Sequence, residues 1–226
     1  MTEEKWLTGE EPETMYWFLE DRGEISIRKF RLFGCECVRD IWDDLPHEAL
    51  RRAVETCERF ADGRATVEEL EVARKAANSV YKGNGDSIAD HSAIAITELC
   101  HTIPSFPMGE GSAAGISAVA AEVRFDQVTP WHVARRKAKQ LHCRLLRDIF
   151  GNPFRPVTFS PVWRTDTALS LAQGMYDSRD FGAMPILADA LQDAGCDNAD
   201  VLDHCRDPKG IHVRGCWVVD LVLGKS

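Results

Sequence analysis

The stretch that decides the fold is residues 146–224, and three parts of it carry most of the information. These parts are LRDIFGNPFRPVTFSPVW (146–163), MPILADALQDAGCDNADVLDHC (184–205) and HVRGCWVVDLVLG (212–224). The first part ends a helix, because Gly151 permits a left-handed cap and the prolines that follow cannot continue a helix. We predict that residues 151–164 form a proline-rich extended segment that lies across the helices.

The rest of this stretch is predicted to be helical. Pro185 in a first turn and Gly195 at an end bound one helix, and Asn198 can cap a short helix that reaches Cys205. Periodicity alone does not decide whether the final apolar run, CWVVDLVLG, is a buried strand or a core helix. A lone strand would leave its backbone hydrogen-bonding groups unmatched, and the chain has no second strong strand to pair with it. We therefore predict a helix.

Upstream, the chain has the pattern of successive helices with short connections. Ser26 can cap one helix, and Thr66 with Glu69 forms the capping-box pattern at the start of another. The sequence thus predicts an all-α, single-domain array of about ten helices over residues 1–226. A possible subdivision falls near the glycines and prolines of residues 104–111, with the C-terminal half beginning at residue 129.

Composition and charge exclude several classes of function. The 226 residues are 44% hydrophobic and 28% charged, as in an ordinary globular protein. The net charge of -9 opposes binding to nucleic acid or to anionic membranes, since phosphate binding needs a cationic surface. No apolar run approaches the roughly 20 residues that span a bilayer, and the acidic N-terminus lacks a secretory signal. We expect a cytoplasmic protein that binds neither membrane nor nucleic acid.

The cysteines are the main candidates for chemistry. The chain has eight, and in a cytoplasmic protein we expect them to be reduced and mostly buried, with no metal or other cofactor. The alternative is a zinc site formed by Cys196, Cys205, His212 and Cys216, in which His212 and Cys216 form the only plausible chelating pair. His204 is adjacent to Cys205, and the two cannot easily serve the same ion.

Other chemical signatures are weak. Glu98 and His101 form an E-x-x-H pattern, but a dinuclear site needs a second copy and the chain has none. A cysteine nucleophile needs an accessible thiol with a lowered pKa, which sequence spacing does not reveal. The chain has no phosphate-binding glycine loop and no H-E-x-x-H motif.

The helix that ends at Phe150 carries a cluster of basic residues in an otherwise acidic protein. Such a cluster is usually solvated or paired with carboxylates of the same protein. The alternative is that Arg135, Arg136 and Lys139 bind an acidic protein partner.

Several segments resemble a paralogue-rich family of uncharacterised bacterial proteins. They are KFRLFGCECVRDIW (29–42), RRAVETCERFADG (51–63), LLRDIFGNPFRPV (145–157), PILADALQDAGC (185–196) and HVRGCWVVDLVLGK (212–225). The resemblance implies a shared fold and no catalytic residue. We therefore predict a non-enzymatic protein-interaction or regulatory module, and the alternative is a metal-dependent or thiol-dependent enzyme that uses the C-terminal cysteines and histidines.

Overall fold

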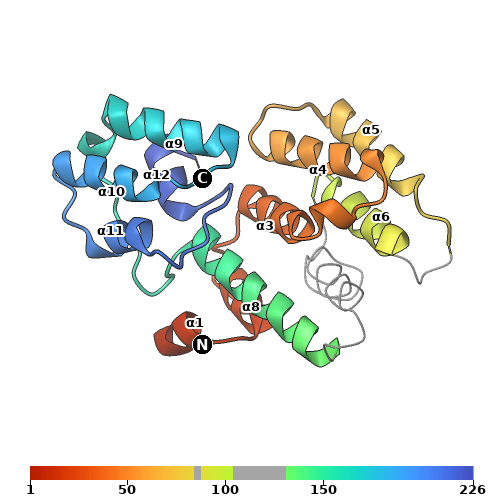
Figure 1. The fold of residues 1–226 in the computed structure, drawn as a ribbon, viewed down its shortest axis with the longest axis horizontal. Coiled ribbons are helices and arrows are strands. Elements are labelled where there is room, and N and C mark those ends of the chain that lie inside the picture. Colours follow the sequence, from red (N-terminus) through yellow and green to blue (C-terminus); the bar gives the residue numbers. More distant parts are fainter. Residues whose placement is uncertain (84–87, 104–130, 226) are drawn as a thin grey trace. The chain divides into compact units, whose positions relative to one another are not determined.

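The computed structural model describes residues 1–83, 88–103 and 131–225, and every regular element in these ranges is a helix (Figure 1). Eleven α-helices and two short 3-10 helices are seen there, which confirms the predicted all-α fold. The possible subdivision near residues 104–111 lies outside the described residues. Among the helices that are described, none has both the length and the apolar character needed to cross a membrane.

The helices form two compact units that divide within α8 (Trp131–Phe150). One unit consists of residues 1–9 and 144–226 and is called the C-terminal unit below. The other consists of residues 10–143 and is called the N-terminal unit. The residue pattern predicts one domain over residues 1–226, with a possible subdivision near residues 104–111. The pattern of residues gave no sign that the first nine group with the last eighty or so.

In residues 10–83, 88–103 and 131–143, the part of the N-terminal unit that the structure describes, there are five complete helices, one short 3-10 helix and the start of α8. They are α2 (Pro12–Asp21), α3 (Ile27–Arg39), η1 (Trp42–Asp44), α4 (Glu48–Ala61), α5 (Val67–Asn78) and α6 (Ile88–Leu99). The predicted caps are present: the Ser26 hydroxyl accepts a hydrogen bond from the Lys29 N–H, and Thr66 and Glu69 form a complete capping box. Helices α3, α4 and α6 pack against one another. Their contact depends on Gly34, because a side chain there would meet Leu99.

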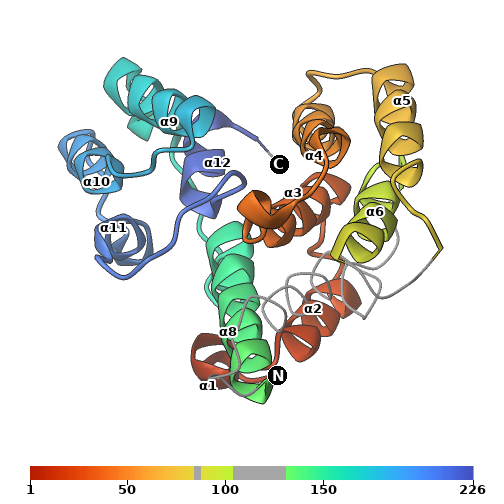
Figure 2. The ribbon, with the colours of Figure 1, turned by 45° about the vertical axis from the view of Figure 1, so that its right-hand side comes forward.

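The C-terminal unit contains five complete helices, one short 3-10 helix and the end of α8. They are α1 (Glu3–Thr8), η2 (Pro161–Trp163), α9 (Asp166–Ser178), α10 (Met184–Asp193), α11 (Ala199–Arg206) and α12 (Trp217–Leu223). Helices α9 to α12 pack around one apolar core. Figure 2 shows these four helices together in cyan and blue. The final apolar run is helical, which confirms the prediction made for it. The proline-rich segment has no regular structure until η2.

A buried aromatic side chain fixes helix α1 to the rest of the C-terminal unit, residues 144–225. The Trp6 ring is fully buried, and its indole N–H donates a hydrogen bond of 3.0 Å to the carbonyl of Gly151. The guanidinium of Arg147 donates to the carbonyls of Trp6 and Gly9, at 2.7 and 2.6 Å. Gly151 has a φ of 71°, and a Cβ there would lie 3.2 Å from the Trp217 ring. The connection after α8 therefore requires glycine at this position.

Candidate metal centre

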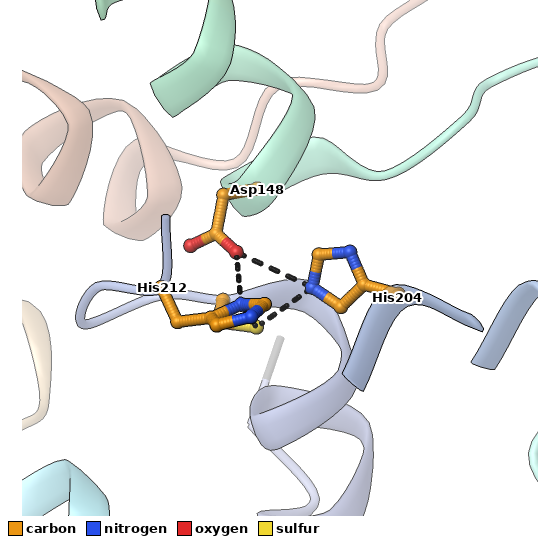
Figure 3. A group of neighbouring side chains, drawn as sticks. Asp148, His204 and His212 are labelled. Carbon is orange, nitrogen blue, oxygen red and sulfur yellow. Dashed lines mark hydrogen bonds and ion pairs between the residues drawn. The ribbon is translucent and has the colours of Figure 1, made fainter. Parts of the chain in front are cut away.

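Four side chains from three parts of the C-terminal unit converge on one point (Figure 3). Asp148 comes from the end of α8, and His204 comes from α11. His212 lies in the loop after α11, and Cys216 is the residue that precedes the first turn of α12. One donor atom from each of the four lies within 4.8 Å of the others.

Four of the six distances between these donor atoms lie near those around a single tetrahedral ion. Asp148 Oδ1 is 3.0 Å from His212 Nδ1 and 3.3 Å from His204 Nε2. Cys216 Sγ is 3.2 Å from His204 Nε2 and 3.9 Å from His212 Nδ1. Tetrahedral zinc, with bonds of about 2.0–2.1 Å to nitrogen or oxygen and about 2.3 Å to sulfur, places its ligands roughly 3.3–3.6 Å apart. The other two distances are at most 4.8 Å, so an ion of this size could contact all four donors once the side chains move closer together.

Local backbone structure explains how two histidines and a cysteine reach the same point. Successive residues of a helix point about 100° apart, so His204 faces the centre while Cys205 faces the apolar core. The chain then reverses between His212 and Cys216. The Cys216 N–H donates to the Val213 carbonyl at 3.0 Å, and Gly215 has a φ of 93°.

Neighbouring groups fix the orientation of the donors. The second carboxylate oxygen of Asp148 accepts a hydrogen bond of 3.0 Å from the Val213 N–H, which leaves Oδ1 directed at the histidines. A Cβ at Gly210 would lie 3.0 Å from His212 Nε2, so the absence of a side chain there makes room for the imidazole. Such outer contacts orient ligands in metal sites and tune the affinity for the ion.

Asp148 and Cys216 are both buried, but only for the Asp148 carboxylate do hydrogen bonds outweigh the effect of burial on the pKa. Asp148 is 2% exposed and Cys216 is fully buried. Burial alone would raise the pKa of the Asp148 carboxyl, but hydrogen bonds with His204 and His212 outweigh burial and leave that pKa below its usual value. Burial, with the negative charge of Asp148, raises the pKa of the Cys216 thiol well above its usual value. A bound cation would reverse this preference, because metal coordination deprotonates a thiol.

The structure brings together only half of the zinc site that the sequence suggested. His212 and Cys216 are close, as the predicted chelating pair, but Cys196 and Cys205 are buried in the apolar core of the unit and are not among the four converging residues. His204, which was not included in the predicted zinc site, takes the place expected for one of these two cysteines. Asp148 was missed, because nothing in the spacing of residues links it to a histidine that follows 56 positions later in the chain.

The residues predicted to bind an acidic partner lie on α8. Arg136 pairs with Glu10 at 2.8 Å, and Lys139 pairs with Glu11 at 2.7 Å, so two of the three residues proposed for partner binding contact carboxylates of their own unit. Arg135 is exposed.

The E-x-x-H pair makes only a loose contact on the surface. Glu98 and His101 are 4.0 Å apart, and both side chains are about half exposed. In the residues that the structure describes, neither belongs to a group of three or more metal-binding side chains.

Comparisons of the chain with protein-family models, with curated proteins and with solved structures found no match. The resemblance noted above stays a prediction.

Proposed function

We propose that the C-terminal unit binds one zinc ion through Asp148, His204, His212 and Cys216, and that the ion has a structural role in a non-enzymatic protein. The convergence of four donor atoms within 4.8 Å carries this proposal. One thiol, two imidazoles and one carboxylate form a donor set suited to zinc, whereas magnesium and calcium prefer oxygen ligands alone.

The number of protein ligands favours a structural ion over a catalytic one. Catalytic zinc sites usually have three protein ligands and leave the fourth position to water or substrate. Here four protein donors are available, and the most exposed of the four side chains, His204, is only 19% exposed. An ion held by all four would have no open position for a substrate.

The properties of the thiols argue against a thiol-dependent enzyme. Burial raises the pKa of Cys196, raises that of Cys205 to about 12 and raises that of Cys216 well above its usual value. All three side chains are at least 98% buried. A nucleophilic cysteine needs the opposite combination, a lowered pKa and access to substrate.

A structural ion would act on the elements that supply its ligands. It would tie the end of α8 to α11 and to the start of α12, across a loop that has no regular structure from residue 207 to 216. This would give the unit a fixed surface for contact with a partner, in line with the predicted interaction module. Binding of an acidic partner at Arg135, Arg136 and Lys139 has weaker support, since Arg136 and Lys139 already pair with glutamates.

The adjacent residues His204 and Cys205 provide the test. Untagged full-length protein would be expressed with supplied zinc, and its metal content would be measured by elemental mass spectrometry. We expect about one zinc per chain in the wild type and in Cys205→Ala, and none in His204→Ala. The proposal fails if the wild type contains no zinc, or if the two variants retain the metal equally.

A further inference from the structure

A second group of cysteines lies in the N-terminal unit, where α3, α4 and α6 pack together. Cys35 is in α3, Cys57 is in α4, and Cys100 directly follows α6. All three are buried and at most 2% exposed. The Sγ atoms of Cys57 and Cys100 are 3.0 Å apart, and Cys35 forms a side-chain hydrogen bond with Cys57. None of these three cysteines belongs to the candidate metal centre.

The distance between the two sulfurs fits one kind of chemistry better than another. Two thiolates on one tetrahedral zinc ion are roughly 3.7 Å apart, given zinc–sulfur bonds of about 2.3 Å. The sulfurs of Cys57 and Cys100 are closer than this. They need to approach by only about 1 Å to reach the disulfide bond length of about 2.05 Å. The pair is therefore better arranged to form a disulfide than to share a metal ion.

We propose that Cys57 and Cys100 are a redox-sensitive pair that forms an intramolecular disulfide when it meets a small disulfide oxidant such as glutathione disulfide. The Cys100 thiolate attacks one glutathione sulfur, forms a mixed disulfide and releases the first glutathione. The Cys57 thiolate then attacks the Cys100 sulfur and displaces the second glutathione. The two cysteines lose two electrons and two protons, and the oxidant gains them as two glutathione thiols.

The position of Cys100 makes it the first thiol to be reached. It lies at the C-terminal end of α6, and residues 101–103 that follow it are exposed, whereas Cys57 lies within α4. Helix ends open locally at a much lower free energy than a helix interior does. Opening of the last turn of α6 would therefore present Cys100 to the oxidant.

Arg31 controls this opening. Its buried guanidinium donates hydrogen bonds to the carbonyls of Leu99, His101 and Thr102, the last two at 2.7 and 3.0 Å. These bonds hold the end of α6 closed over Cys100. The rate of oxidation is then set by how often this contact is released, and the identity of the product is set by the short distance to Cys57.

The test is a map of disulfides in the full-length protein. Reduced protein is incubated with glutathione disulfide, remaining thiols are blocked in denaturant with N-ethylmaleimide, and the chain is cut with trypsin. Cys57 and Cys100 then fall on separate peptides, residues 53–59 and 83–124, and each peptide has one cysteine. Cys35 falls on a third peptide, residues 32–39, with Cys37.

We expect the peptides 53–59 and 83–124 to be joined, with a mass two hydrogen atoms below their sum. Cys35→Ser is the matched control and should still form the same link. Cys57→Ser should instead leave a glutathione on Cys100. To ensure that slow access does not hide the reaction, unfolded reduced protein is also refolded in a glutathione redox buffer. The absence of the link in both experiments, or a link through peptide 32–39 instead, would overturn the proposal.

Discussion

Cys216 and Cys205 offer a matched pair of substitutions, because both are buried thiols of the C-terminal unit and only Cys216 belongs to the proposed zinc centre. Serine at either position replaces a buried thiol with a hydroxyl. Burying a poorly satisfied polar group destabilises a protein by roughly 1–3 kcal/mol. We therefore expect the two metal-free variants to lose similar amounts of stability. They should differ only when zinc is present.

The size of this difference follows from binding linkage. An ion that binds only the folded state raises the free energy of unfolding by about 2.7 kcal/mol when free zinc is at 100 times its Kd. A change of 1 kcal/mol moves the Tm of a domain of 60–100 residues by roughly 4–8 °C. Zinc should thus raise the Tm of the C-terminal unit by roughly 10–20 °C in the wild type and in Cys205→Ser. In Cys216→Ser the rise should nearly vanish, since three donors hold the ion far more weakly.

Differential scanning calorimetry measures this effect, with free zinc fixed by a metal buffer and a zinc-free sample prepared with a chelator. Far-ultraviolet circular dichroism checks that both variants stay helical in the absence of metal. An equal zinc-dependent rise in the two variants would refute the assignment of Cys216 as a ligand. No rise in the wild type would refute the zinc centre itself.

Three further predictions concern other parts of the chain. Burial, aided by the charge of Lys139, lowers the pKa of His142 to about 4. Below the ordinary histidine pKa of about 6.5, the unfolded chain therefore binds a proton that the folded chain does not. The free energy of unfolding should therefore be highest above pH 6.5 and should fall by about 2–3 kcal/mol, because of His142 alone, as the pH drops to 4. In urea titrations His142→Leu should not show this loss, and identical pH profiles for the variant and the wild type would contradict the prediction. Gly151→Ala should destabilise the C-terminal unit by about 1–3 kcal/mol, because alanine is strained at a φ of 71° and would crowd Trp217, and an unchanged Tm would count against this reasoning. Arg136→Glu should change stability by less than about 1 kcal/mol, since its ion pair with Glu10 is exposed; a loss of several kcal/mol in denaturant titration would show that the pair is structural.

Sequence alone predicted those helices whose signals are local. Ser26 and Thr66 start helices because their side chains satisfy the first backbone N–H groups, a property that depends only on a few neighbouring residues. Helix α1 was not predicted, although Thr2 caps it. A helix of six residues is not stable by itself, and this one depends on the burial of Trp6 in a distant part of the chain.

Two of the four residues of the candidate metal centre were predicted, because only those two are brought together by local sequence. His212 and Cys216 are four residues apart, so their proximity follows from local chain reversal. Asp148 and His204 join them only because the fold brings the end of α8 close to one residue of α11, and no local pattern specifies that proximity. Cys205 was included in the alternative zinc site beside Cys196, because the face of a short helix that will be buried is not fixed by its own residues.

The anchoring of α1 by Trp6 has a consequence for how the protein is made. The first nine residues belong with residues 144–226, so the N-terminal unit is inserted into the sequence of the C-terminal unit. Chains are synthesised from the N-terminus, and domains generally fold as units when their residues have emerged. The N-terminal unit can therefore fold while the ribosome is still at work, whereas Trp6, which is synthesised before that unit, must wait for Gly151 and the helices beyond it. In this protein the residues around Trp6 are synthesised before the N-terminal unit and reach their native positions after it.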